Sequence, residues 1–291
     1  MPFRRPLLAA LALAAACALP ALAGDAEDGT DQEVWGNRSW VIDENTQIGI
    51  ARFEDLYTEF LSIFRDWELV TSIGGYRFEV DGDWGPGVPL GSDVSGDGLP
   101  DLVAMEYSGG AHCCSTYYVY SLGPEIALSG VLETWDAGAA FVNLDSTPAL
   151  EVESNDMSFA YWNTSFADSP APRVVWRWDG RAYVGAPDLM AAPAPSPAEL
   201  ASGAARIADS DAWGRDYMDP ELWRVMLDLI YSGHMEQAWV FMEAGWQPGR
   251  DGLEAFRRDF ACTLQASPWW PTVAELNAVA GPLVTDCPVP G

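Results

Sequence analysis

The sequence predicts an α+β protein, in which a β-rich N-terminal domain is followed by a C-terminal α-helical module. From residue 68 to about residue 184, short β-rich runs such as LVAMEY and TYYVYSL alternate with Gly, Pro and Asp, which is typical of strands joined by turns. Beyond residue 195, apolar residues recur at helical spacing behind clear helix-start signals. We therefore expect a β-rich domain over residues 24–186, a Pro/Ala linker over 187–195 and the helical module over 196–291.

The N-terminus has the pattern of a secretory signal peptide over residues 1–23. Two Arg residues precede the short apolar run LLAALALAAACALP, and the small residues A-L-A that end at Ala23 offer a cleavage site. The alternative is a lipoprotein processed before Cys17, but the usual Leu three places before such a Cys is missing. We therefore expect a periplasmic or extracellular protein that begins near Gly24. No later segment is long and apolar enough to predict a membrane span.

The chain is strongly acidic. Its formal net charge is -28, and all 15 basic residues are Arg. A surface of this kind repels nucleic acid and anionic membranes, so we do not expect them as partners. It suits divalent cations or cationic surfaces, although simple solubility in a salty medium is the preferred explanation.

Two further patterns predict local structure at the two ends of the β-rich region. The segment RFEDLYTEFLSIFRDW, residues 52–67, predicts an amphipathic helix. Its apolar residues at helical spacing are Phe53, Leu56, Tyr57, Phe60, Leu61 and Phe64. WRWDGRAYV predicts a β-hairpin in which Asp179-Gly180 is a two-residue turn of type I′.

The helical module carries explicit start signals. Ser196 is a capping residue, Pro197 stands at the first helical position, and Glu199 completes a capping box. Asp219-Pro220 repeats the arrangement of a cap followed by Pro. The segments HMEQAWVFMEAG and LEAFRRDFACTLQ predict two further helices, and we expect the aromatic residues of the module to form its core.

An acidic loop, SDVSGDGLPD, precedes the strand-like run LVAMEY. Acidic or hydroxyl residues occupy positions 1, 3, 5 and 9 of this loop, and Gly98 at position 6 permits a sharp turn. Alternate positions of a tight loop point inward, so their oxygens converge on one small volume, as Ca²⁺ requires. The candidate calcium ligands are Asp93, Ser95, Asp97, the backbone carbonyl of Leu99, and Asp101.

This loop resembles the DxxGDGxxD loops of the FG-GAP and VCBS repeat families over about residues 91–103. An EF-hand would need Glu at position 12, where Ala104 stands, and a helix would follow in place of the strand-like LVAMEY. The resemblance implies calcium-loop hairpins, with the ion bound between strands. Ser95 departs from the Asn or Asp usual at position 3. The alternative is an acidic turn stabilised by its own backbone hydrogen bonds.

A degenerate second copy follows about fifty residues downstream, in VNLDSTPALEV. The same frame places Asn143, Asp145, Thr147 and Glu151 at positions 1, 3, 5 and 9. Pro148 replaces the turn Gly and Thr replaces an Asp, so the charge is lower. We expect calcium binding at this copy to be weaker or lost.

Four cysteines remain once the signal peptide is removed, and an even count in an exported protein predicts disulfides. They are Cys113, Cys114, Cys262 and Cys287. The run GGAHCC also resembles one in uncharacterised bacterial exported proteins, a family with no secure activity. In one interpretation Cys113 bridges Cys114, and Cys262 bridges Cys287.

Two other interpretations of GGAHCC stay open. Cys113 and Cys114 could each bridge to one of the two C-terminal cysteines, which would tie the β-rich domain to the helices. Alternatively, His112 and the two thiols could bind zinc or copper, or form a redox centre. An oxidising compartment argues against free thiols.

For the function as a whole, the sequence favours an exported calcium-stabilised binding or interaction protein without catalytic activity. Its partner would be an unidentified protein or glycan. An alternative is a hydrolase of polysaccharide or cell wall with structural calcium, which would need a cleft holding two carboxylates of divergent pKa. The stretch FAYWNTSFADSPAPRV could line a groove for sugar or peptide, or it could be sheet core. A redox role through His112 is the third hypothesis. No GxSxG motif is present, so nucleophilic catalysis is not supported.

Overall fold

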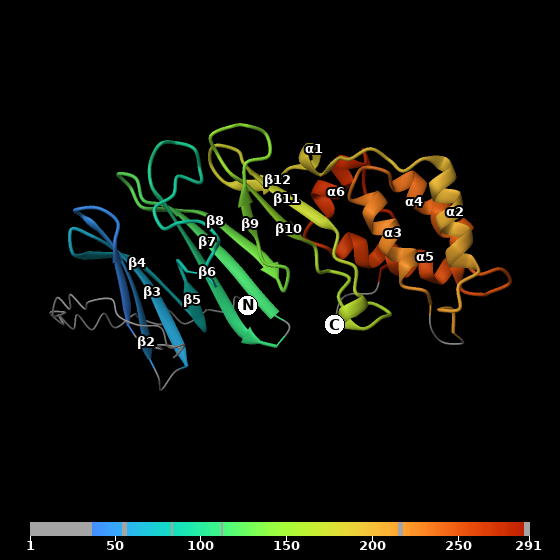
Figure 1. The fold of residues 1–291 in the computed structure, drawn as a ribbon, viewed down its shortest axis with the longest axis horizontal. Helices are drawn as coiled ribbons and strands as arrows, with labels where there is room; N and C mark the ends of the chain where they lie inside the picture. The colour runs from blue at the N-terminus through green and yellow to red at the C-terminus, as the bar shows by residue number, and fades with distance from the viewer. Residues whose placement is uncertain (1–36, 54–56, 83, 112, 215–217, 288–291) are drawn as a thin grey trace, which may run out of the picture. The chain divides into compact units, whose positions relative to one another are not determined.

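The computed structural model describes residues 37–53, 57–82, 84–111, 113–214 and 218–287. The predicted signal peptide lies outside these residues. The described chain forms three antiparallel sheets and six α-helices, so the α+β class is confirmed (Figure 1). All of these described residues belong to one compact unit.

The first sheet has the strand order β1-β2-β3-β4. Its strands are β1 (Arg38–Val41), β2 (Thr46–Phe53), β3 (Thr58–Arg65) and β4 (Glu68–Gly75). The helix predicted over residues 52–67 is therefore wrong. In β3 the side chains of Glu59, Leu61 and Ile63 are buried at every second position, the period of a strand and not of a helix. Leu61 and Ile63 pack with Ile48 and Ile50 of β2, a contact that only the sheet makes.

The second sheet has the order β5-β6-β7-β8 and packs on the first. Its strands are β5 (Arg77–Glu79), β6 (Asp101–Gly110), β7 (Cys113–Ser121) and β8 (Ala127–Trp135). Phe78 and Leu102 of this sheet share one buried cluster with Ile48 and Leu61 of the first sheet. The strand that follows the predicted calcium loop, β6, therefore lies inside its sheet and contributes to a core.

The third sheet has the order β12-β11-β10-β9. Its strands are β9 (Ala140–Val142), β10 (Glu151–Asn155), β11 (Arg173–Trp178) and β12 (Tyr183–Gly185), with a short 3₁₀ helix, η2 (Phe166–Asp168), before β11. The predicted hairpin forms, but its turn is longer than expected. Trp178 pairs with Tyr183, so four residues connect the strands, and the Asp179 carboxylate accepts both the Arg181 and Ala182 N–H groups at 2.8 Å.

Six helices follow (Figure 1). They are α1 (Pro187–Met190), α2 (Pro197–Ala208), α3 (Glu221–Ile230), α4 (Met235–Gly245), α5 (Leu253–Ala266) and α6 (Trp270–Leu276). The predicted capping box is present, because Ser196 Oγ accepts the Glu199 N–H at 3.3 Å and Glu199 Oε2 accepts the Ser196 N–H at 2.8 Å. The stretch expected as a linker contains α1, whose Met190 is buried. Among the described residues, none of the helices has the length and apolarity needed to span a membrane.

The helices and the third sheet share one hydrophobic core. Val174 and Val175 of β11 belong to the same buried cluster as Trp223 and Phe260 of the helices. A polar network crosses the same boundary at Asp156. Its Oδ2 accepts the hydroxyls of Tyr231 and Ser267, and its Oδ1 accepts the N–H and hydroxyl of Ser158. Every oxygen of this buried carboxylate is thus hydrogen-bonded, which is what burial of a charge requires.

Candidate functional site

The acidic loop over residues 92–101 is closed by a hydrogen bond from the Asp101 N–H to the Ser92 carbonyl at 3.0 Å. Asp101, the ninth residue of the predicted ligand frame, is the first residue of β6. Gly96 and Gly98 have φ values of 73° and 85°, in the left-handed region that Gly adopts without a steric penalty. The five predicted ligands are therefore held within one tight turn at the start of a core strand.

The carboxylates of Asp93 and Asp97 organise the turn. Asp93 Oδ1 accepts the N–H groups of Gly96 at 2.7 Å and Asp97 at 3.1 Å, and its Oδ2 accepts the Gly98 N–H at 2.8 Å. Asp97 Oδ1 accepts the Leu99 N–H at 2.8 Å. These bonds agree with the alternative interpretation of a self-stabilised acidic turn. However, a carboxylate has about four lone-pair sites, so it can accept N–H groups and still ligate a cation.

Asp101 and Ser95 are not satisfied in this way. Asp101 is 1% exposed, and its Oδ2 accepts the N–H groups of Val94 at 2.9 Å and Ser95 at 2.8 Å. Its Oδ1 and the buried hydroxyl of Ser95 have no hydrogen-bond partner within the described part of the chain. A buried polar atom without a partner costs about 1–3 kcal/mol, and more when it is charged. Two predicted calcium ligands thus present the orphaned oxygens that a bound cation would satisfy.

The electrostatics of Asp101 point the same way. Burial raises the pKa of its carboxyl above the usual value, and the nearby charge of Asp97 raises the pKa further, although the N–H groups of Ser95 and Val94 and the nearby Ser95 hydroxyl oppose this. That hydroxyl is close enough to Asp101 to affect its pKa, but it does not meet the geometry of a hydrogen bond. The folded protein therefore disfavours the negative charge that it holds at this position. A divalent cation would remove this penalty.

The second loop repeats the first in its backbone. Asn143 Oδ1 accepts the N–H of the residue three places on, Ser146, at 2.9 Å, as Asp93 does with Gly96. Ser146 also has a positive φ of 65°, as Gly96 does. Glu151 Oε2 accepts the N–H of the residue seven places back at 2.6 Å, as Asp101 Oδ2 does. The predicted internal repeat therefore has a structural counterpart.

The remaining predicted residues of this loop are bonded among themselves. Asp145 Oδ1 accepts the Thr147 N–H at 2.9 Å, and the Thr147 carbonyl accepts the Asn143 side-chain amide. Glu151 is fully buried, and its Oε1 has no hydrogen-bond partner among the described residues. The two loops therefore each bury a ninth-position carboxylate with one orphaned oxygen.

The two loops touch. The Leu150 N–H donates to the Val94 carbonyl at 2.9 Å, and the Tyr183 hydroxyl donates to the same carbonyl at 3.2 Å. A Cβ on Gly96 would lie 2.4 Å from the Ala149 backbone nitrogen, so only Gly permits this approach. The two loops are therefore joined by direct backbone contact.

Arg177 of β11 was not among the predicted site residues. Its Nε lies 3.3 Å from Asp145 Oδ2, and the other two nitrogens donate to both carboxylate oxygens of Asp188 at 3.0 and 2.8 Å. The charge of Glu151 also helps to raise the Arg177 pKa, after the larger effect of Asp188. An Arg inside the apolar strand RVVWRW was the one sequence signal for a charged partner, but it did not say which.

The loops do not form a ready-made cluster of charged ligands. In the described ranges, no three His, Cys, Asp or Glu side chains are grouped so as to hold a metal ion. The candidate set depends instead on the Ser95 hydroxyl, the Leu99 carbonyl and carboxylates that already accept backbone N–H groups. Hard oxygen donors of this mixed kind are those that Ca²⁺ accepts.

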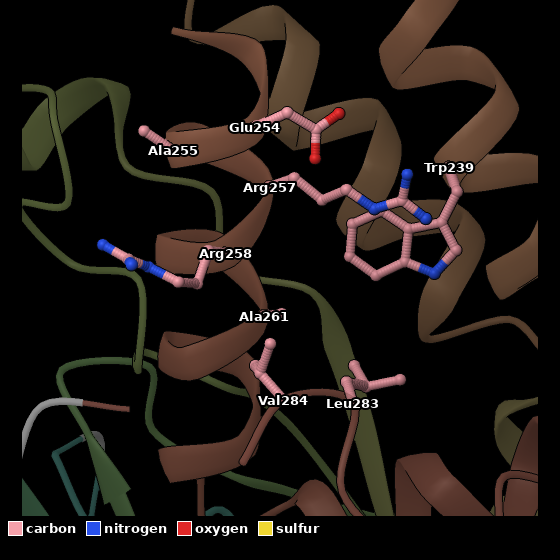
Figure 2. A pocket seen from close by; sticks show the side chains of 8 residues that line it. All are labelled: Trp239, Glu254, Ala255, Arg257, Arg258, Ala261, Leu283 and Val284. Carbon is pink, nitrogen blue, oxygen red and sulfur yellow. The ribbon is translucent and has the colours of Figure 1, made fainter. Parts of the chain in front are cut away.

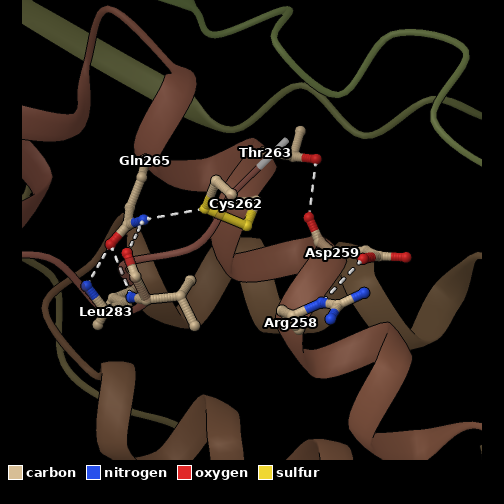
Figure 3. The surroundings of a disulfide bond; sticks show 8 residues. Arg258, Asp259, Cys262, Thr263, Gln265 and Leu283 are labelled. Atoms are coloured by element: carbon tan, nitrogen blue, oxygen red, sulfur yellow. Dashed lines mark hydrogen bonds and ion pairs between the residues drawn. A yellow bond between two sulfur atoms is a disulfide. The ribbon is translucent and has the colours of Figure 1, made fainter. Parts of the chain in front are cut away.

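The C-terminal cysteines pair with each other. Cys262 of α5 and Cys287 form a disulfide with a Cα–Cα distance of 5.4 Å, and Figure 3 shows its surroundings. Gln265 holds the same segment, accepting the Val284 N–H and donating to the Val284 carbonyl, both at 3.1 Å. This pairing excludes the interpretation in which Cys113 and Cys114 bridge to the C-terminal cysteines.

Little of the GGAHCC run supports a metal or redox centre. Cys114 is disulfide-bonded, so it offers no free thiolate. His112 and the side chain of Cys113 lie outside the described part of the structure. The other His, His234, has its Nε2 2.7 Å from the Ala192 carbonyl, beside the start of α4.

The aromatic stretch before β11 contributes in part to the core. Phe159 is fully buried, and Trp162 packs against Trp223, Phe256 and Phe260 with ring centroids 5.4–5.8 Å apart. Packing between the third sheet and the helices therefore explains Phe159 and Trp162. Tyr161 is 57% exposed, and Trp162 and Asn163 also line a cavity of about 260 Å³ together with Asp251 and Asp259.

A cavity of about 590 Å³ lies beside α5 (Figure 2). Arg257 stands over the Trp239 ring at 5.3 Å, and its guanidinium is 3.3 Å from Glu243. One carboxylate, that of Glu254, lines this cavity. Glycoside hydrolysis needs a pair of carboxyl groups, so the lining of this particular cavity does not favour the hydrolase hypothesis.

Comparisons of this chain with family models, with curated proteins and with solved structures found no match. The likeness to FG-GAP and VCBS loops therefore stays an expectation from one short segment. The features that bear on function are therefore the geometry of the two loops and the exposed surface of the protein.

Proposed function

We propose that this is an exported, calcium-stabilised binding or interaction protein without catalytic activity, and that the loop over residues 92–101 binds the ion. The observation that carries the proposal is the pair of buried, orphaned oxygens, Asp101 Oδ1 and Ser95 Oγ. Asp93, Asp97 and the Leu99 carbonyl complete the proposed ligand set. The Cys262–Cys287 disulfide is compatible with an oxidising, exported setting.

In this proposal the ion stabilises the protein and takes no part in chemistry. Bound Ca²⁺ supplies positive charge to a carboxylate that burial alone penalises. Asp101 begins β6, and Leu102 and Ala104 of that strand are fully buried in the core between the first two sheets. Ligation would therefore hold the start of a core strand and, through the Val94 carbonyl, the second loop as well.

We further propose that the second loop binds calcium weakly or not at all, because Arg177 supplies positive charge beside Asp145 from within the chain, while the Oε1 of Glu151 keeps no hydrogen-bond partner among the described residues. The first loop carries three carboxylates in its ligand frame, whereas the second carries two. The Arg177 guanidinium lies within ion-pair distance of one of these two, Asp145. A fixed guanidinium and a bound cation are alternative ways to offset the same carboxylates. The expected stoichiometry is thus one Ca²⁺ per chain.

The test is thermal unfolding in calcium, in magnesium and in chelator. An ion that binds only the folded state adds about 2.7 kcal/mol at one hundred times its Kd. For a chain of this size that free energy corresponds to a rise in Tm of about 5–10 °C. We expect this rise in calcium and not in magnesium, because Mg²⁺ demands regular octahedral geometry. An equal Tm in calcium and in chelator would contradict the proposal.

Two variants sharpen this experiment. Asp97→Asn should abolish the calcium-dependent rise, whereas Asp251→Asn, which removes an exposed carboxylate before α5, should keep it. Equilibrium dialysis should find one ion per unmutated chain. In Arg177→Gln the second loop loses its positive charge. The variant should then either bind a second Ca²⁺ per chain or have a lower free energy of unfolding by the same amount with and without calcium. Two ions on the unmutated chain would refute the role given to Arg177.

A further inference from the structure

One hairpin of the first sheet displays a large aromatic side chain at its tip. Trp67 stands in the two-residue turn between β3 and β4, where Arg65 pairs with Glu68, and it is 80% exposed. Full exposure of an indole forfeits most of the hydrophobic stabilisation that burial would provide. The fold therefore gains little from a Trp at this position.

The backbone of the turn also disfavours a Trp. Asp66 and Trp67 have φ values of 52° and 67°, so both central residues are left-handed, as in a type I′ turn. Asn or Asp followed by Gly is the favoured pair for this turn, and a bulky residue at positive φ is a genuine outlier. Asp66 fits the preference, whereas Trp67 occupies the place of the Gly.

Several loops meet at this end of the sheets. The Asp66 N–H donates to the Asn45 carbonyl of the β1–β2 turn at 2.8 Å. Arg65 donates to the carbonyls of Leu122 and Gly123 in the β7–β8 loop, both at 2.9 Å. The Leu122 N–H in turn donates to the Pro100 carbonyl, directly before β6, at 3.0 Å. Trp67 is thus presented by a hydrogen-bonded group of loops and not by a free tip.

These loops are acidic. The segments 41–46, 65–70 and 122–126 contain five carboxylates and one basic residue, Arg65. The Arg65 guanidinium donates to the two loop carbonyls, and its charge also helps to lower the pKa of Asp43, after the larger effect of the Asn45 N–H, so it offsets only part of this negative charge. Exposed apolar side chains lie beside the acids, since Val41 is 73% and Leu69 is 58% exposed. We name this surface, made by the β1–β2, β3–β4 and β7–β8 turns with Trp67 at its tip, the Trp67 face.

We propose that the Trp67 face docks a cationic, Arg- or Lys-containing segment of a partner protein. A guanidinium or ammonium would stack on the Trp67 indole, and the carboxylates of Asp66 and Glu68 would flank it. The excess of negative charge selects a cationic partner and disfavours an anionic membrane. This inference rests on the proposed interaction role and names its partner class, but it does not require calcium.

The binding test uses the synthetic peptide Gly-Arg-Gly-Arg-Gly, titrated into the whole protein by calorimetry in calcium and again in chelator. Trp67→Ala should weaken binding about tenfold or more, as expected for a central aromatic contact. This substitution leaves the net charge unchanged, so bulk attraction to a protein of charge -28 cannot mimic the effect.

The matched control is Trp135→Ala. Trp135 is also exposed, by 52%, and also has a positive φ, of 53°. It ends β8 at the Ser115 end of β7, far from the loop that joins Ser121 to Ala127. Its replacement should leave the affinity for the peptide within twofold of the unmutated value.

A further variant separates binding from folding. Trp67→Gly relieves the left-handed backbone, so it should unfold at the same Tm as the unmutated protein or a higher one, and yet lose the peptide. Equal binding by Trp67→Ala and the unmutated protein would overturn the proposal. Binding to neutral phosphatidylcholine vesicles that depends on Trp67, without peptide binding, would overturn it in favour of a membrane surface. If calcium does not change the Tm of the unmutated protein but the peptide still binds, the calcium proposal is refuted and the docking proposal stands.

Discussion

The substitution Asp101→Asn tests the ion site most directly, because its effect on stability should change sign with calcium. The carboxylate is 1% exposed, and Asn keeps an oxygen that can accept the N–H groups of Val94 and Ser95. The new amide nitrogen replaces the orphaned Oδ1 and can donate to the Ser95 hydroxyl, which interacts with the same side chain. In chelator the substitution therefore removes a penalised charge and replaces the orphaned Oδ1 by an amide nitrogen that can donate to the Ser95 hydroxyl.

The magnitude follows from these contacts. Relief of a buried, unsatisfied polar atom contributes about 1–3 kcal/mol, so Asp101→Asn should be more stable than the unmutated protein by about 1–2 kcal/mol in chelator. In calcium at one hundred times the Kd the unmutated protein gains about 2.7 kcal/mol that the variant cannot gain. The variant should then be the less stable of the two by about 1 kcal/mol.

The assay is urea unfolding at equilibrium, with calcium and with chelator. Asp156→Asn is the matched control, because Asp156 is also a buried carboxylate but both of its oxygens are hydrogen-bonded. It should destabilise the protein by the same amount in both conditions. If Asp101→Asn lowers the stability equally with and without calcium, Asp101 is a plain structural acceptor and the calcium reasoning fails.

Three further predictions concern the rest of the fold. Tyr231→Phe removes a buried hydrogen bond to the Asp156 carboxylate and should cost about 1.5–3 kcal/mol in urea unfolding; a cost near zero would contradict the role of this contact between sheet and helices. Replacing Cys262 and Cys287 together by Ser opens a loop with a sequence separation of 25 and should cost about 3 kcal/mol, whereas an unchanged unfolding midpoint would contradict it. Burial and a neighbouring carboxylate raise the pKa of Tyr118 to about 12. The protonated phenol therefore contributes stability below about pH 10, and this contribution is lost as the pH rises toward 12. Tyr118→Phe should make the fall in stability at alkaline pH shallower, and an unchanged slope would refute this.

Local signals in the sequence were sufficient where the stabilising partners are near neighbours in the chain. The Ser196–Glu199 capping box and the turn at Gly98 depend on contacts within a few residues, and the structure has them as predicted. The spacing of the acidic loop also indicated the internal repeat, and the first residue of each loop accepts the N–H of the residue three places on. Such features depend only on contacts between side chain and backbone within one turn, and not on the rest of the fold.

The segment over residues 58–65 shows where local pattern fails. Phe60, Leu61 and Phe64 satisfy a helical spacing, while Leu61 and Ile63 satisfy an alternating one. The strand prevails because Leu61 and Ile63 become buried only when β2 pairs beside them and the second sheet covers them. The same applies to the hairpin at Asp179, whose carboxylate caps a four-residue turn in place of the predicted two-residue turn.

The sequence by itself determined the α+β class, the capped start of α2 and the candidate ligands of the first loop, because each depends on residue type and short spacing. Only the tertiary structure decided that Arg177 reaches Asp145, that Gly96 meets the backbone of Ala149, and that the turn at Trp67 joins the other loops. These contacts join residues that lie more than twenty positions apart. Their energies are realised only once the sheets have assembled, so no local pattern could have specified them.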